Sequence, residues 1–335
     1  MFLTTALDIG RDSHNREPRA ACRSRRQPGV RGGTAGLKVA TAIGLFLVVV
    51  SSASAATEAG AWAPAQKVDE VAGNSSDLNT PSLDGCPIHS PDGLSLYLAS
   101  NRPGGHGGID IWLARRASTD APFAAPENLP APINSAADDF CPTPLPGNRL
   151  LFVSRRVTEH SCGIGDSDIF ATRHNPAHGW QAPQHLACTP DGPNSTLDEQ
   201  GPSLVEIDGV DHLYFSRNSA TVPGDIFVSR NFGPATAVSE LNSPGNDIQP
   251  NVRKDGREIV FSSNHPYPGA HGGQDVYVST RASVDDPWSS PQNLGDAVNT
   301  TAGETRPSLS WDAGTLLFGR APGPEGMSDI YVSTR

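Results

Sequence analysis

One pattern repeats five times along this chain, and its last copy reads Asn299-Thr300-Thr301-Ala302-Gly303-Glu304-Thr305-Arg306-Pro307. Each copy opens with Asn and then Ser or Thr, places an acid five residues after the Asn, and places a proline three residues later. The other copies open at Asn79-Thr80, Asn134-Ser135, Asn194-Ser195 and Asn242-Ser243. The five acids are Asp84, Asp139, Glu199, Asp247 and Glu304. Five copies in register indicate a repeat architecture.

Beyond the proline, every copy continues as a short apolar strand, a turn and a second apolar strand. The turns contain Gly or Asn, which supply the positive φ that tight hairpins need. A third strand opens with an acid in every copy, namely Asp110, Asp168, Asp225, Asp275 and Asp329. A fourth strand is expected to open with an aromatic residue and a proline, at 123–126, 180–183 and 288–291. Four strands in each period of roughly 50–60 residues predict a β-propeller.

We therefore predict an all-β fold for residues 62–335, a single five-bladed propeller of four-stranded antiparallel blades. The last copy stops after its third strand, at Arg335. The segment Trp62-Ala63-Pro64-Ala65-Gln66-Lys67-Val68, ahead of the first copy, has the character of a fourth strand. We expect this N-terminal segment to supply the outer strand of the last blade, because ring closure removes an exposed sheet edge.

Residues 1–55 read as a leader that ends in a signal peptide. Its apolar core, residues 39–50, follows Lys38, and Ala53-Ser54-Ala55 resembles a cleavage site, with cleavage expected near 55/56. The apolar run is too short to cross a hydrocarbon layer of about 30 Å. The sequence thus predicts an exported protein, periplasmic or extracellular, with no membrane span after signal removal.

Charge and cysteine content agree with export. Without residues 1–55, 17 basic and 33 acidic residues remain, a net charge of −16, which disfavours nucleic acid as a partner. Four cysteines remain, an even number that favours disulfides in an oxidising compartment. Cys86 and Cys141 share one repeat position, and Cys162 and Cys188 would lie on one face. We favour the pairs Cys86–Cys141 and Cys162–Cys188, and the other two connectivities stay open.

The hairpins resemble a known repeat. The sequence Ser90-Pro91-Asp92-Gly93-Leu94-Ser95-Leu96-Tyr97, followed by Ser100-Asn101-Arg102 and Gly108-Ile109-Asp110-Ile111-Trp112, resembles the WD40-like PD40 repeat of the TolB propeller of bacterial envelopes. Ser263-Asn264-His265 with Gly272-Gly273-Gln274-Asp275-Val276-Tyr277 is similar again. The resemblance covers the chain after Trp62 and implies a polar central channel that takes proteins, peptides or small ligands. TolB has six blades and an N-terminal α/β domain, whereas five copies and no such domain occur here.

The five repeat acids are the candidate ligand-binding residues, since each would lie near the mouth of the channel. A ring of acids could bind a cation or a basic group. Alternatively, each acid accepts hydrogen bonds from the backbone of its own crossover loop, which repetition in every blade favours. The third-strand acids have arginines nearby, and we interpret them as local ion pairs across the hairpin. These arginines are Arg102, Arg156, Arg217 and Arg320.

No motif for a metal, a cofactor or a nucleophile accompanies these acids. The sequence contains no HExxH, CxxC or GxSxG pattern and no phosphate loop between a strand and a helix, so we expect no metal, no cofactor and no catalytic residue of those kinds. Ser310-Trp311-Asp312-Ala313-Gly314 begins like the Asp box of sialidases, but Leu316-Leu317 breaks the motif. We interpret this stretch as an ordinary hairpin turn.

Three functional hypotheses follow. The favoured one is a monomeric binding or scaffold module that takes an unknown protein, peptide or glycan through its channel face. The alternative is a carbohydrate-active, glycosidase-like enzyme that uses two channel carboxylates as acid and base. The third is a structural envelope protein without a dedicated ligand. Catalysis is disfavoured by the regular repetition of the acids, but the sequence leaves it open.

Overall fold

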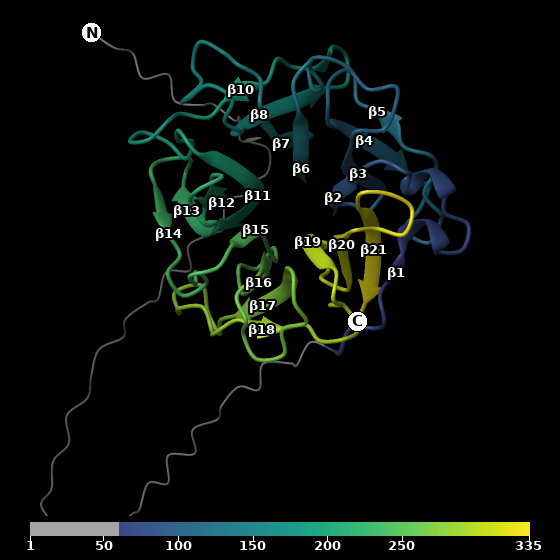
Figure 1. Ribbon diagram of the computed structural model, residues 1–335. Coiled ribbons are helices and arrows are strands. Elements are labelled where there is room, and N and C mark those ends of the chain that lie inside the picture. The colour runs from purple at the N-terminus through teal and green to yellow at the C-terminus, as the bar shows by residue number, and fades with distance from the viewer. Residues whose placement is uncertain (1–59) are drawn as a thin grey trace, which may run out of the picture. The chain divides into compact units, whose positions relative to one another are not determined.

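The computed structural model describes residues 60–335, and the predicted leader, signal peptide and cleavage site lie outside the described residues. Five antiparallel sheets surround a central axis (Figure 1). Residues 60–335 contain two short 3-10 helices, η1 (Val68–Glu70) and η2 (Ser76–Leu78), and no α-helix. The predicted all-β propeller of five antiparallel blades is confirmed.

In every blade the first strand lies at the axis and the last at the rim (Figure 1). Blade 1 contains β2 (Asp84–His89), β3 (Ser95–Ser100), β4 (Asp110–Arg115) and β5 (Glu127–Asn128). Blade 2 contains β6 (Asp139–Leu145), β7 (Arg149–Ser154), β8 (Asp168–Asn175) and β10 (Gln184–His185), with β9 (Gly179–Trp180) also paired to β8. Blade 3 contains β11 (Asp198–Ile207), β12 (Val210–Asn218), β13 (Asp225–Arg230) and β14 (Ala235–Ala237). Blade 4 contains β15 (Asp247–Val252), β16 (Glu258–Ser263), β17 (Asp275–Thr280) and β18 (Gln292–Asn293). Blade 5 contains β19 (Gly303–Leu309), β20 (Thr315–Ala321), β21 (Asp329–Thr334) and β1 (Gln66–Lys67).

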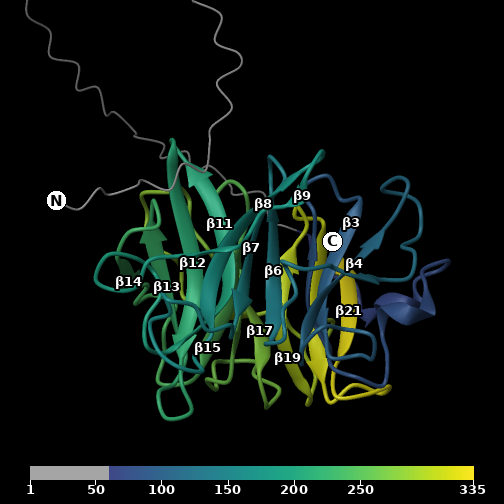
Figure 2. The ribbon, with the colours of Figure 1, turned by 90° about the horizontal axis from the view of Figure 1, so that it is seen from above.

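The strands run between two ends of the propeller, as the side view shows (Figure 2). Because the strands of a blade alternate in direction, the loops that connect one blade to the next share one end with the loops between second and third strands. We call this the crossover end. The turns between first and second strands and the loops between third and fourth strands lie at the other end, which we call the hairpin end.

Blade 5 takes its outer strand from the N-terminal segment. β1 pairs antiparallel with β21, with Gln66 opposite Val332 and Lys67 opposite Tyr331. The backbone N–H of Ala63 also donates to the carbonyl of Thr334 at 2.8 Å. The Arg335 guanidinium lies 4.5 Å from the centre of the Trp62 ring, within the range of a cation–π contact.

Every first strand contains a β-bulge immediately before its proline. In blade 5 the register shifts between Thr305 and Ser308, and the bulge residue Arg306 has φ 58°. The equivalent residues in blades 1 to 4 are Cys86, Cys141, Gly201 and Gln249, all with positive φ. A bulge leaves one residue outside the ladder, so it accommodates a proline, which has no N–H to donate. It also turns the five bulge residues toward the axis.

The outer strands are shorter than the sequence suggested and begin later. The segments 123–126 and 288–291, expected to open the fourth strands of blades 1 and 4, precede β5 and β18. Proline cannot donate to the ladder, so pairing starts only after it. The aromatic residues Phe123 and Trp288 are instead buried in clusters between neighbouring blades. These clusters make up the core, because each blade packs its apolar faces on the next.

Both favoured disulfides are present. Cys86 and Cys141 bridge blades 1 and 2 at the channel, with Cα atoms 4.9 Å apart. Cys162 and Cys188 bridge two loops of blade 2, with Cα atoms 5.6 Å apart. Two disulfides fit an exported protein, because oxidising compartments outside the cytosol preserve disulfides.

Candidate ligand site

The five repeat acids are fully buried at the start of the first strands or beside it. In blade 2, Asp139 Oδ2 accepts hydrogen bonds from the backbone N of Ser135 at 2.6 Å and from its Oγ at 2.7 Å. The equivalent pairs are Thr80 with Asp84, Ser195 with Glu199, Ser243 with Asp247, and Thr300 with Glu304. The acids thus hold their own crossover loops, the second of the two roles considered from the sequence. Ligand binding by Asp84, Asp139, Glu199, Asp247 or Glu304 stays a prediction.

Four of these acids are also ion-paired. Arg156 Nη2 lies 2.6 Å from Asp139 Oδ1 and donates its other Nη to the Pro132 carbonyl at 3.0 Å. The equivalent pairs are Arg102 with Asp84, Arg217 with Glu199, and Arg320 with Glu304. The assignment of these arginines to the third-strand acids is therefore wrong. Three third-strand acids accept N–H groups of their own loops instead: Asp110, Asp275 and Asp329, with Asp275 accepting from His271 at 2.8 Å. Asp168 lies 2.9 Å from His185 Nε2.

Blade 4 departs from this arrangement. Asp247 lies opposite Ser263, and His265 stands two residues farther on, where blades 1 and 2 place Arg102 and Arg156. Within residues 60–335, Asp247 Oδ1 is buried and has no hydrogen-bond partner.

The channel at the bulges is narrow and contains no carboxylate. A cavity of about 40 Å³ is lined by the bulge residues, the prolines that follow them and their neighbours. The charged residue in this lining is Arg306, and the polar side chains include Gln249 and Asn251. This volume holds a few water-sized groups, not a sugar ring.

A cleft with a volume of about 730 Å³ lies off the axis, between blades 5 and 1 toward the hairpin end. Small-molecule sites in proteins commonly have this volume. The cleft is bounded by the N-terminal segment, by the turns that end β2 and β19, by the loop after β4, and by the end of β21. Several segments far apart in the sequence therefore contribute to one concave surface.

Aromatic side chains line the cleft on both of its sides, one side from blade 5 and the other from blade 1. Trp311, in the turn between β19 and β20, is 41% exposed. On the other side, the rings of His89 and Phe123 stack with their centres 5.6 Å apart, and the Arg116 guanidinium lies 4.4 Å from the Phe123 centre. Burial, and then the charge of Arg116, lower the pKa of His89 to about 4. The His89 ring is therefore neutral at physiological pH.

Two cleft carboxylates, Asp92 and Asp312, stay ionised. The Ser90 hydroxyl and the Leu94 N–H lower the pKa of Asp92. In the same way, the Ser310 hydroxyl and the Gly314 N–H lower the pKa of Asp312. Both acids cap hairpin turns, as expected for Asp in an Asx turn. Glycosidases need one carboxyl group with a raised pKa to act as general acid. Burial raises the pKa of Glu199 to about 7, but Glu199 is fully buried at the start of β11, in blade 3.

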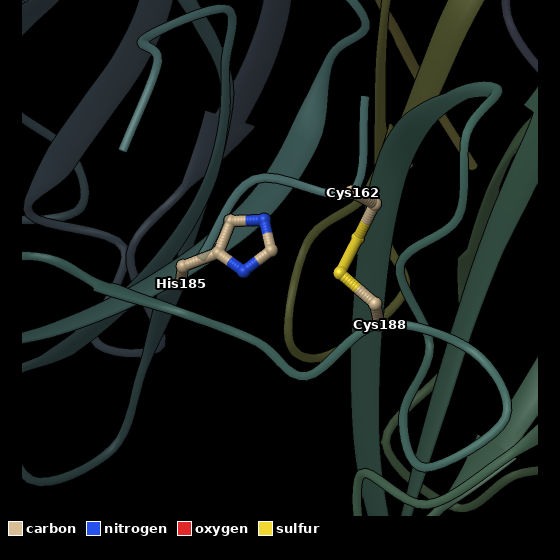
Figure 3. A group of neighbouring side chains, drawn as sticks. All are labelled: Cys162, His185 and Cys188. Carbon is tan, nitrogen blue, oxygen red and sulfur yellow. A yellow bond between two sulfur atoms is a disulfide. The ribbon is translucent and has the colours of Figure 1, made fainter. Parts of the chain in front are cut away.

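A group with metal-ligand chemistry lies beside the second disulfide. Figure 3 shows the His185 ring next to the Cys162–Cys188 bridge. The sulfur atoms and one ring nitrogen lie within 4.8 Å of one another. His185 Nε2 lies 2.9 Å from Asp168 Oδ2, whereas Nδ1 is buried and has no partner in the described part of the chain. While the bridge is intact, the sulfurs are not thiolates and cannot serve as thiolate ligands.

The cleft was not predicted from the sequence. The sequence feature that could have indicated the cleft is Trp311. It lies in the stretch that begins like an Asp box and that we interpreted as a hairpin turn. The turn is confirmed by the pairing of β19 with β20 and by the Ser310–Asp312 hydrogen bond of 2.6 Å. The exposure of the ring depends on the neighbouring blade and cannot be read from one repeat.

Within residues 60–335, no helix is both long and apolar enough to cross a membrane. Comparison with family models and with curated proteins finds no match. Among solved structures, a GH43 endo-arabinanase from Bacillus licheniformis is similar, with 15% identity over 76% of this chain and 94% of that chain and a TM-score of 0.48. A putative TolB from Agrobacterium tumefaciens shares 19% identity over 72% of this chain and 71% of that chain, with a TM-score of 0.44. An α-L-arabinofuranosidase from Lactobacillus brevis shares 12% identity over 74% and 90%, with a TM-score of 0.48. At such identities the likeness concerns the fold alone.

Proposed function

We propose that this propeller is a non-catalytic oligosaccharide-binding module whose site is the cleft between blades 5 and 1. The observation that carries the proposal is the exposed indole of Trp311 on a concave surface of suitable volume. Aromatic rings offer a flat apolar platform for the C–H face of a sugar, and hydroxyl groups around it can bond the sugar hydroxyls. The hydroxyl side chains that line the cleft are Ser90, Thr119, Ser310, Thr315, Ser333 and Thr334.

The chemistry of the acids supports binding without hydrolysis. Asp92 and Asp312 have lowered pKa values, so neither is suited to protonate a leaving group. The repeat acids, which the glycosidase hypothesis requires, are buried and bonded within their own loops. The narrow channel also favours the cleft over the channel face as the binding surface.

The short outer strands argue against peptide binding by strand addition. That mode needs an exposed sheet edge with several free N–H and C=O groups. The outer strands β1, β5, β10 and β18 have two residues each, and the segments beside them also bond the third strands. In blade 1 the N–H groups of Ala124 and Leu129 donate to the carbonyls of Arg115 and Ile111, so little edge is available. We further propose that the protein acts outside the cytoplasm and as a monomer, and the two disulfides support the first of these points.

The test is a binding measurement with Trp311→Ala. The folded domain is screened on an array of neutral and acidic oligosaccharides and on a peptide array, and hits are titrated by calorimetry. We expect an oligosaccharide hit whose affinity falls about tenfold or more in Trp311→Ala, equivalent to roughly 1.4 kcal/mol. Ile164→Ala is the matched control, because Ile164 is 93% exposed in a loop of blade 2, away from the cleft. The control should bind like the parent protein.

Three results would contradict the proposal. One is binding that Trp311→Ala leaves unchanged. Another is a set of peptide hits with no oligosaccharide among them. The third is the appearance of shortened products when a bound oligosaccharide is incubated with the protein.

A further inference from the structure

The channel at the level of the bulges holds a cationic side chain. Arg306 is the bulge residue of β19, and its equivalents are Cys86, Cys141, Gly201 and Gln249. Among the five bulge residues it alone carries a charge. It therefore breaks the symmetry of the repeat at the axis, where the other blades present a disulfide, a glycine and an amide.

Arg306 has no partner. Across residues 60–335, its side chain makes no hydrogen bond or ion pair, and its Nε is buried. A guanidinium offers five N–H donors and stays protonated in proteins, and a buried donor without an acceptor is costly. Burial lowers the pKa of Arg306, which is the direction expected of a cation that lacks a counter-charge. The arginines of the crossover end, in contrast, each bond a carboxylate.

The neighbouring blade leaves room for this guanidinium. A Cβ added at Gly85, in β2, would lie 2.6 Å from Arg306 Nη1, which is closer than atoms can approach. The equivalent positions in the other blades hold Phe140, Gln200, Ile248 and Thr305. Glycine in blade 1 therefore lets the arginine reach across the boundary between blades 5 and 1.

The space beside Arg306 is small and free of negative charge. The cavity of about 40 Å³ is lined by no acid, and its polar groups include the Gln249 amide and the Ser308 hydroxyl. We propose that Arg306 binds a small monovalent anion in the channel, either a halide or the carboxylate of a one-carbon acid. This site is separate from the cleft and does not depend on the proposed function.

The experiment measures thermal unfolding at constant potassium concentration and ionic strength. Potassium gluconate, whose anion is too large for the cavity, is replaced stepwise by potassium chloride, bromide or formate. A ligand that binds only the folded state raises the unfolding midpoint in a saturable manner. We expect a rise of about 2–4 °C, the shift that roughly 1 kcal/mol produces in a domain of this size.

Two variants separate this site from general salt effects. Arg306→Gln should abolish the rise and still fold, because Gln249 occupies the same bulge position in blade 4. Arg230→Gln is the control, since Arg230 is exposed at the end of β13 and its charge lies outside the channel. It should keep the full rise.

The anions distinguish the two ligand sources. A rise with chloride and bromide alone identifies a halide site, and a rise with formate as well identifies a carboxylate site. A bromide-soaked crystal should show an anomalous peak next to the Arg306 guanidinium. No rise relative to gluconate, an equal rise in Arg306→Gln, or a channel without a bromide peak would overturn the proposal.

Discussion

At the scale of single residues, the crossover loops are held by buried carboxylates. In blade 2, one oxygen of Asp139 is bonded to Ser135 and the other to Arg156. The Arg156 group in turn bonds the carbonyls of Pro132 and Ile133. One acid therefore satisfies donors that the loop would otherwise bury unpaired. Its contribution should appear in stability, not in binding.

We predict that Asp139→Asn destabilises the fold by about 1–3 kcal/mol. An amide has one acceptor oxygen, so either the Ser135 N–H or the Arg156 guanidinium loses its partner. Denaturant unfolding measures the change, with Asp285→Asn, at an exposed acid in the loop after β17, as the control. An unchanged free energy of unfolding in Asp139→Asn would make this acid a candidate for ligand binding again.

His89 should make the fold sensitive to acid. Its folded pKa of about 4 lies below the value of about 6.5 for an unfolded chain, so the unfolded state binds the proton first as the pH falls. The stability that neutral His89 contributes is complete above about pH 6.5 and is lost as the pH falls to 4. The loss should be on the order of 1–3 kcal/mol. His89→Phe should flatten this part of the stability curve, measured by urea unfolding between pH 7 and 4. A parallel curve for the variant would show that other groups cause the acid sensitivity.

At the scale of elements, the ring is closed by two paired residues, Gln66 and Lys67, and by the contacts that flank them. The Ser333 hydroxyl donates to the Ala63 carbonyl at 2.5 Å, and Val68 is buried between blades 5 and 1. The strand is short, but it covers the edge of β21, and Val68 fills part of the apolar boundary.

We predict that deleting residues 62–71 destabilises the protein sharply, because β21 loses its partner and the cluster around Val68 opens. Differential scanning calorimetry compares this deletion with a chain that starts at Gly60 and keeps the whole segment. Equal unfolding temperatures would show that β1 contributes little to the closed ring.

At the scale of the whole molecule, the repeat predicted the blade count and the strand order, and both disulfides that the sequence favoured over the other two connectivities are present. The repeat acids could be located from the sequence, but the partners of the arginines could not. Glu199 and Glu304 stand directly opposite Arg217 and Arg320, whereas Asp84 stands opposite Ser100 and reaches Arg102 two residues farther on. Such register depends on the bulges, and only the three-dimensional ladder reveals it. The cleft was missed for a similar reason, since it arises between blades and from no single repeat.

The pairing of β1 with β21, which closes the ring, couples ligand binding in the cleft to the mobility of the N-terminal segment. The N-terminal segment, the end of β21 and the loop of blade 1 that contains Phe123 all border the same cleft. A ligand that contacts all three segments would hold blades 5 and 1 together. Within the described residues, this is the boundary between blades at which the two ends of the chain pair with each other. Binding of the ligand would make transient opening of that boundary less frequent. Slower amide hydrogen exchange at Gln66 and Lys67 would then report that the cleft is occupied, and the ligand would need no label.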